Sequence, residues 1–151
     1  VKNAEDRIFN LVQEDVFRKN VQGTVTTGNR FLTAPNDFLL SFSLAVIDST
    51  TNETVGCSRY YDYNPDENSI LIGYTFIARK YWGKGYNASL KKVMLNYIFQ
   101  YVSSVYFHIG NQNFRSQKAI EKFGAHKVGE QEVEYYGETA KMNYIYKINK
   151  I

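Results

Sequence analysis

Apolar and polar positions alternate over several short stretches of this chain, and turn residues bound each stretch. This pattern predicts strands over residues 38–47, 55–63, 69–78, 105–109, 128–136 and 142–148. The stretch 69–78 is apolar on both faces, which is typical of a central strand. Two helices are predicted among these strands. One runs from Tyr86 with apolar residues at helical spacing as far as Val102, and the other covers 114–123 and ends at Gly124.

The first part of the chain, residues 1–34, is polar with scattered apolar positions, and it predicts one or two short helices. The complete order is then helices, two strands, two strand–helix units and two strands. Such an order favours a mixed α/β sheet. A chain of 151 residues with no linker or repeat fits a single domain, so we expect one domain over 1–151, with its core at 38–148.

Composition excludes several classes of protein. The formal net charge is +3, which is too mild for a typical nucleic-acid or membrane-surface protein, and no apolar run approaches the roughly 20 residues of a membrane span. We therefore expect no nucleic-acid or membrane partner. The one cysteine, Cys57, excludes an internal disulfide framework, and we expect it to be a small buried residue. These features favour a soluble cytoplasmic domain.

The stretch 78–89, ARKYWGKGYNAS, links the predicted central strand to the following helix. A glycine-bent turn that opens a helix presents unpaired backbone N–H groups at the positive end of the helix dipole, where phosphate binds well. Arg79, Lys80 and Lys84 add positive charge. The stretch is neither a Walker loop nor a dinucleotide fingerprint, because the required glycine spacing is absent. The alternative is that its glycines only let the chain turn.

A second stretch, 110–125, reads GNQNFRSQKAIEKFGA and leads from a strand end into a basic helix. Asn113 and Ser116 lie at the start of that helix, where such residues often cap. They are also three residues apart, so both side chains could face a ligand beside the strand end.

Taken together, the two stretches resemble the GNAT N-acetyltransferase superfamily, and in particular its ribosomal-protein N-terminal acetyltransferase-like branch. The resemblance rests on Ile72-Gly73-Tyr74, on the run from Trp82 to Leu90, on Asn113 to Ser116 and on Lys122 to Ala125. It covers roughly 38–148. It implies a single-domain, mostly antiparallel twisted sheet with a splay between central strands and flanking helices. The family usually opens with a further strand, which we do not find in 1–34.

The resemblance implies that acetyl-CoA is the co-substrate and that no metal is needed. The strand before the loop would take the pantetheine arm through backbone hydrogen bonds, the loop amides would take the pyrophosphate, and two polar residues would line the thioester end. Carried onto this chain, the cofactor-binding residues are Phe76, Ile77, Ala78, Lys80, Trp82, Gly83, Lys84, Gly85, Tyr86, Asn87, Asn113 and Ser116.

The catalytic residues are less completely matched. Many members of the superfamily protonate the departing thiolate with a tyrosine seven residues after the motif asparagine, and here that position is Ile120. Ser116 is the available replacement, as a hydrogen-bond donor. An acceptor ammonium must lose a proton, so a general base is expected. We prefer Glu134, with Glu132, His108 and Asp62 as alternatives.

The resulting hypothesis is an N-acetyltransferase that acts on a primary amine, either a small molecule or a peptide N-terminus, as a monomer or homodimer. Two alternatives stay open. One is a non-catalytic CoA-binding module that has kept the loop and lost the acid. The other is a small nucleic-acid-binding domain, which only the basic and aromatic residues favour. Tyr60, Tyr61 and Tyr63 could line an acceptor pocket or simply pack on a sheet.

Overall fold

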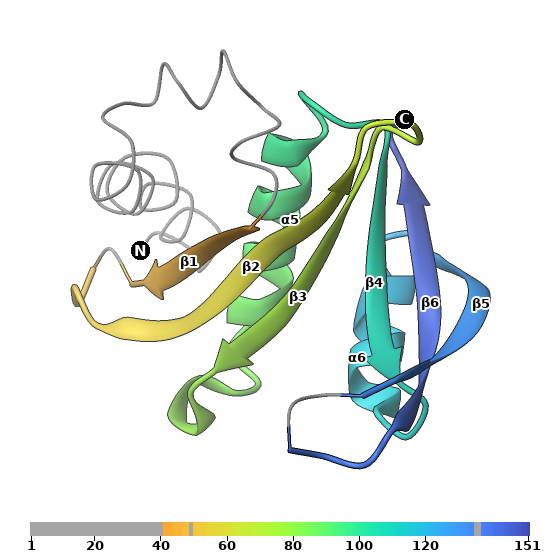
Figure 1. Cartoon of the computed structure of the whole chain (residues 1–151). Coiled ribbons are helices and arrows are strands. Elements are labelled where there is room, and N and C mark those ends of the chain that lie inside the picture. The colour runs from red at the N-terminus through yellow and green to blue at the C-terminus, as the bar shows by residue number, and fades with distance from the viewer. Residues whose placement is uncertain (1–40, 49, 135–136) are drawn as a thin grey trace.

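Strands from the described part of the chain form one six-stranded sheet, in the order β1-β2-β3-β4-β6-β5 (Figure 1). The strands are β1 Ser41–Ile47, β2 Thr54–Asn64, β3 Ser69–Ile77, β4 Ser104–Gly110, β5 His126–Val133 and β6 Lys141–Asn149. The structure, a computed structural model, describes residues 41–48, 50–134 and 137–151. The helices predicted for 1–34 lie outside the described residues.

Neighbouring strands are antiparallel everywhere in this sheet except between β3 and β4, which are parallel. β3 pairs with a strand on each side, which confirms that the doubly apolar stretch is a central strand. β6 lies between β4 and β5, so the last two strands form a hairpin whose second strand is the inner one. The predicted mixed α/β sheet, mostly antiparallel and flanked by helices, is confirmed.

Two helices lie on the same face of the sheet, α5 Tyr86–Ile98 behind β2 and β3 and α6 Phe114–Glu121 behind β4 and β6 (Figure 1). The buried apolar face of α5 has the spacing expected of an amphipathic helix. It joins the inward side chains of the strands in one core. The main members from α5 and β4 are Leu90, Val93, Met94, Ile98, Val105, Phe107 and Ile109. The intervening β4 side chains, Tyr106 and His108, therefore point to the opposite face.

The end of α5 differs from the prediction. The helical pattern continued to Val102, but the helix ends at Ile98. The next residues form tighter turns, in which Gln100 N donates to Tyr97 O at 3.2 Å and Tyr101 N to Ile98 O at 2.9 Å. These turns keep Val102 buried, so the apolar period outlasts the α-helix itself.

Two further predictions need correction. β5 was expected over 128–136 and is found at His126–Val133, an edge strand that is mostly exposed along its length. Cys57 was expected to be buried, and it is exposed. On β2 the inward positions are Ser58 and Tyr60, so the alternation of the strand turns Cys57 outward.

Candidate functional site

The central feature is a gap between β3 and β4. The two strands pair only at their beginnings, where Ser69, Ile70 and Leu71 face Ser104, Val105 and Tyr106. Both strands then continue without pairing to each other, and Figure 1 shows them diverging from the top of the view to the bottom. β3 also contains a bulge, because the β2–β3 register shifts near Ser58 and Tyr74 has a φ of 51°. A bulge bends its strand. The splay that the resemblance implied is therefore present.

The backbone of β3 presents polar groups to this gap. Ala78 N donates to Val55 O of β2 at 2.8 Å, so the amide of Ala78 is used within the sheet. N–H groups of successive strand residues point to opposite edges, and that of Ile77 therefore points toward the gap. Ile77 O accepts a hydrogen bond from Trp82 Nε1 at 2.7 Å. The side chain of Phe76 is 61% exposed.

The glycine-bent loop after β3 has the geometry of an anion-binding turn. It contains the short 3₁₀ helix η2 Arg79–Tyr81, followed by Gly83 with φ 74° and Gly85 with φ 83°. Gly85 precedes α5, and the first bond within the helix runs from Ser89 N to Gly85 O. The amides of the first turn consequently have no partner within the helix. No acidic residue or side-chain cap lies there to neutralise the helix dipole.

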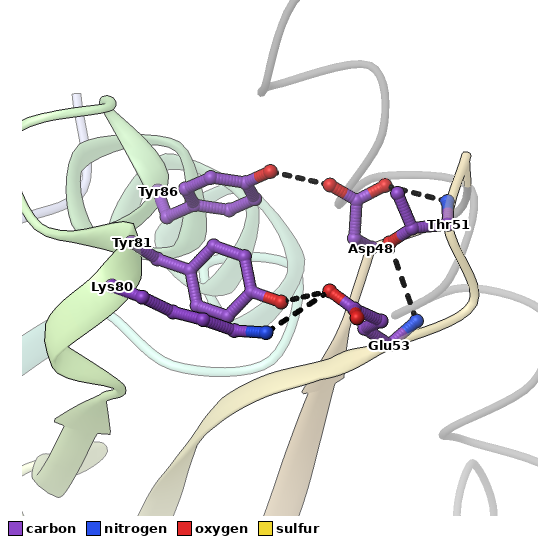
Figure 2. A network of polar contacts seen from close by, with 6 residues as sticks. All are labelled: Asp48, Thr51, Glu53, Lys80, Tyr81 and Tyr86. Atoms are coloured by element: carbon purple, nitrogen blue, oxygen red, sulfur yellow. Dashed lines mark hydrogen bonds and ion pairs between the residues drawn. The ribbon is translucent and has the colours of Figure 1, made fainter.

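Two tyrosines fix this loop against the turn between β1 and β2 (Figure 2). Tyr81 donates a hydrogen bond to Glu53, and Tyr86 donates one to the buried carboxylate of Asp48. Asp48 also accepts from the backbone of Thr50 at 2.8 Å. The hydrogen bond from Tyr81, together with the nearby charge of Lys80, lowers the pKa of the Glu53 carboxyl.

The same network includes Lys80, one of the residues that the resemblance implies for the cofactor. Lys80 Nζ lies 3.4 Å from Glu53 Oε2. Both side chains are exposed, so their attraction is weak and screened by salt. Lys84, another of the predicted cations, is exposed beside the glycines.

The second motif begins α6 close to the end of β4. Asn113 Oδ1 accepts a hydrogen bond from Ser116 N at 3.2 Å, so the asparagine caps the helix. The cap uses the backbone of Ser116 and leaves its hydroxyl out. Gln117 Nε2 donates to Gly110 O at 2.9 Å and to Asn111 O at 3.1 Å, which fixes the strand-to-helix turn. Gln117 was not singled out from the sequence.

One contact brings the two motifs together. The guanidinium of Arg115, on α6, lies 4.5 Å from the ring centroid of Trp82 in the loop, and that of Arg79 lies 5.8 Å from the same ring. Two cations therefore lie beside the loop: Arg79 belongs to the loop itself, and Arg115 comes from α6. The sequence did not indicate Arg115, because residues so far apart along the chain give no pairing signal.

Exposed aromatic side chains surround the gap. Large exposed apolar groups are expected where a ligand or partner binds. Those on the gap's borders and at its open end are Tyr74, Phe76, Trp82 and Phe114, between 48% and 61% exposed.

The predicted catalytic residues are less closely connected to the gap. Ser116 is half-buried on the first turn of α6, and Ile120 is buried in the core. Glu134 is exposed just after β5, and Glu132 is exposed within it. His108 is half-buried on the face of β4 away from the helices, and burial lowers its pKa while the charge of Asp62 acts in the opposite direction.

On that face, β2, β3 and β4 line a hollow of about 520 Å³. It contains two carboxylates, Asp62 and Glu67, and the rings of Tyr63 and Tyr106. Of the tyrosines proposed for an acceptor pocket, only Tyr63 lies here. Tyr60 is in the core and donates to Met94 O at 2.8 Å, while Tyr61 packs edge-on against Tyr74.

Two further observations concern the described residues as a whole. None of their helices is long and apolar enough to cross a membrane. Nor do they contain a group of three or more His, Cys, Asp and Glu side chains placed to hold a metal ion.

Comparisons with known proteins agree with this arrangement. A family model described as "Acetyltransferase (GNAT) domain" matches residues 4–126. A search of the curated proteins finds no significant match. Among solved structures, one described as an acetyltransferase has a TM-score of 0.64 at 21% identity, over 80% of this chain and 61% of that chain. This chain thus spans about three fifths of that protein.

Two other structures carry more specific descriptions. A spermidine N-acetyltransferase from Vibrio cholerae, described as dodecameric, has a TM-score of 0.64 at 19% identity, over 80% of this chain and 69% of that chain. An acetyltransferase of the GNAT family from Bacillus anthracis has a TM-score of 0.62 at 22% identity, over 96% of this chain and 88% of that chain. At these identities the likeness concerns the fold.

Proposed function

We propose, for a chain that belongs to the GNAT acetyltransferase family, that it transfers an acetyl group from acetyl-CoA to a primary amine while both are bound. The observation that carries this proposal is the gap between β3 and β4, which opens toward the amide-rich start of α5. A thioester held along β3 would place its phosphates at that helix start, where the backbone and dipole favour anions.

The residues present fit this substrate. The backbone of Phe76 to Ala78 would take the pantetheine arm, with Ile77 N–H as the donor that faces the gap. The amides from Trp82 to Asn87 would take the pyrophosphate, and Gly83 and Gly85 allow its close approach. Arg79, Lys80, Lys84 and Arg115 would supply positive charge, and Arg115 is an addition to the residues expected from the sequence.

The chemistry asks for three contributions from the protein. The acceptor nitrogen must be neutral to attack the carbonyl carbon, so a base or a water must take its proton, and Glu134 remains our proposal for that role. The carbonyl oxygen becomes negative, and a backbone N–H of β3 near Ile77 would donate to it. The sulfur leaves as a thiolate, which a hydrogen bond from the Ser116 hydroxyl would stabilise.

Ser116→Ala tests the last role. We expect kcat to fall by roughly 10²- to 10³-fold with little change in the KM for acetyl-CoA, because the interaction forms mainly in the transition state. The helix cap survives this change, since Asn113 bonds to the backbone N–H of Ser116. A raised KM with normal kcat, measured by steady-state kinetics, would make Ser116 a binding contact.

The acceptor is proposed to be cationic before it reacts. The hollow lined by Asp62, Glu67 and the rings of Tyr63 and Tyr106 combines the groups that bind alkylammonium ions. One structural neighbour is a spermidine N-acetyltransferase, so polyamines belong in the first panel of acceptors. The ribosomal-protein N-terminal acetyltransferase-like branch also stays a proposal, and peptides with free N-termini test it.

A second candidate is a CoA-binding module without activity. The observation that favours it is Ile120, an apolar core residue where the resemblance calls for an acid. Thiol release from acetyl-CoA, measured with polyamines, small amines and peptides, separates the two functions. Turnover on any acceptor supports the transferase. Tight CoA binding by calorimetry with no turnover on the whole panel supports the binding module.

The remaining expectations are part of the same proposal. We propose a cytoplasmic location, a monomeric or homodimeric state, and no nucleic-acid or membrane partner. Sedimentation at several protein concentrations measures the oligomeric state. Salt-dependent binding to single-stranded oligonucleotides would contradict the last expectation.

A further inference from the structure

An amine is buried at the edge of the gap. Lys91 is on α5, and its side chain is 5% exposed. Its Nζ donates a hydrogen bond to the hydroxyl of Thr75 and lies 5.8 Å from the ring centroid of Phe107. Thr75 and Phe107 belong to β3 and β4, and both come after the last paired residues of those strands. The amine therefore lies between the separating strands, on the helix side of the sheet.

Within the described part of the chain, the surroundings of this amine are almost entirely uncharged. Among the described residues its hydrogen bond goes to a neutral hydroxyl, and Thr75 is bonded in turn to Ser58 Oγ at 2.8 Å. Tyr60 is the titratable group on the inward face of β2, and its hydroxyl donates to Met94 O. On α6 and β6, Glu121 is paired with the hydroxyl of Tyr146 at 3.1 Å. Burial, the one cause acting here, lowers the pKa of Lys91 to about 7.

A lysine in this position is costly for folding, because an apolar side chain would fill the same space without desolvating an amine. Strongly perturbed ionisable groups often belong to functional sites. The role that is open is that of the proton donor to the departing sulfur, because the residue expected there is absent. Ile120, where the resemblance calls for the proton donor, is buried in the same core between helices and sheet. Lys91 approaches the gap from that same side of the sheet.

We propose that Lys91 is the general acid of the acetyl transfer and protonates the departing sulfur. This role rests on the proposed function. As the carbon–sulfur bond breaks, the sulfur takes the electron pair and a proton moves from Lys91 Nζ to it, giving the free CoA thiol and a neutral amine. The acceptor nitrogen gives up a proton to Glu134, the proposed base, when it forms the amide, Glu134 passes that proton to solvent, and solvent returns one proton to Lys91. The hydroxyl of Thr75 keeps Nζ oriented, and Ser116 contributes only a hydrogen bond.

The proton affinity of the Lys91 amine suits a general acid. A general acid works best when its pKa lies near the working pH, since it is then both protonated and willing to donate. An ordinary lysine holds its proton too tightly at neutral pH. The rate should consequently fall as pH rises through about 7, when Lys91 loses its proton.

The experiment compares Lys91→Met, Lys91→Arg and the neighbouring exposed lysine as Lys92→Met. Each purified variant is checked by circular dichroism, and its affinity for acetyl-CoA is measured by calorimetry. The pH profile of kcat is then recorded with an acceptor that the unmodified chain uses. We expect Lys91→Met to bind acetyl-CoA within about threefold of the unmodified chain and to lose at least a hundredfold in kcat. The decline of kcat above neutral pH should also disappear, and Lys92→Met should behave normally.

The remaining measurement does not depend on turnover. NMR of the lysine ε-carbon, assigned with Lys91→Met, should show the Lys91 titration near pH 7 and move it when acetyl-CoA binds. An unchanged kcat and pH profile in Lys91→Met overturns the proposal, as does lost acetyl-CoA binding in a folded variant, which would make Lys91 a binding contact. Failure of the proposed function looks different, because the unmodified chain then turns over no acceptor, and that result overturns both. Lys91→Arg should stay impaired, since a guanidinium does not give up its proton.

Discussion

Gly56 on β2 touches β3 so closely that no side chain fits. A Cβ at this position would lie 2.0 Å from Phe76 O, a backbone atom that cannot move aside without disturbing the edge of the gap. We predict that Gly56→Ala lowers the free energy of unfolding by about 3 kcal/mol. Gly129→Ala is the matched control, because its Cβ would meet only Ile145 Cδ1 at 3.7 Å. Chemical denaturation measures both, and equal small losses would contradict the prediction.

Lys91 also makes stability depend on pH. Its pKa falls from the ordinary 10.5 to about 7 on folding, so between these values the unfolded chain binds a proton that the folded chain does not. The contribution of Lys91 to stability therefore rises with pH across that window, by at most about 1.4 kcal/mol per unit. Below pH 7 both states are charged and the cost of the buried ammonium is fully present.

Lys91→Met removes that cost and leaves Thr75 bonded to Ser58. We predict that the variant is more stable than the unmodified chain, with the largest difference at pH 6–7 and a shrinking difference toward pH 10. Denaturant melts at several pH values measure this, with Lys92→Met as the exposed control. A difference that stays constant over the range would mean that Lys91 titrates normally.

Single residues show why the sequence indicated only part of the candidate site. Asn113 and Ser116 could be singled out because a capping pattern is local, and the structure confirms the cap that they form. Lys91 gave no signal, since one lysine within an amphipathic helix usually points to solvent. Its burial depends on the position of Thr75, which is 16 residues away and belongs to another element.

At the level of elements, the loop between β3 and α5 carries the clearest prediction. Gly83 and Gly85 have positive φ values, and no atom lies within 4 Å of an added Cβ at either position. A valine there strains the backbone and blocks close approach of a ligand without a clash inside the protein. We predict that Gly83→Val and Gly85→Val each weaken CoA binding more than tenfold.

The control for this experiment is Gly124→Val. Gly124 has a φ of 92° and equally open surroundings, but it follows α6 instead of preceding α5. The Gly124→Val variant should lose about as much stability as the two loop variants, measured by thermal melts, and keep its CoA affinity, measured by calorimetry. Normal affinity in both loop variants would show that the phosphates bind elsewhere.

The elements themselves were largely predictable. Every predicted strand and helix from residue 41 onward exists. The reason is that the spacing of apolar residues follows which side chains each element buries, and this spacing can be read from the sequence. Their ends were harder to predict. α5 stops before its apolar period does, and β5 is shifted because an exposed edge strand has little apolar pattern to mark its limits. The tyrosine–carboxylate bonds that fix the loop join elements distant in sequence and could not be read from either one alone.

For the whole molecule, the gap between β3 and β4 lets us predict which backbone amides a bound ligand protects from hydrogen exchange. Among the described strands, the ends of β3 and β4 that face the gap have no partner on that side, so their gap-facing amides should exchange quickly with solvent. We predict that CoA slows exchange at Ile77 and at those amides of residues 107–110 that face the gap, while amides in the β1–β2 pair change little. Hydrogen exchange read by NMR tests this. Equal slowing throughout the sheet would indicate global stabilisation instead of occupation of the gap.

The short parallel contact between β3 and β4 has a mechanical consequence. Three residue pairs join one three-stranded half of the sheet to the other, and they lie at one end. The backbone hydrogen bonds of this seam alone resist bending of the halves weakly, and the displacement that bending produces is greatest at the far end. A molecule that contacts both halves at that far end opposes their separation at the greatest distance from the seam. A few contacts there therefore stiffen the sheet more than the same contacts beside the seam. Under the proposed function, release of the CoA product would then be coupled to the separation of the two halves of the sheet. Substitutions at the seam would alter the dissociation rate of CoA without contacting it.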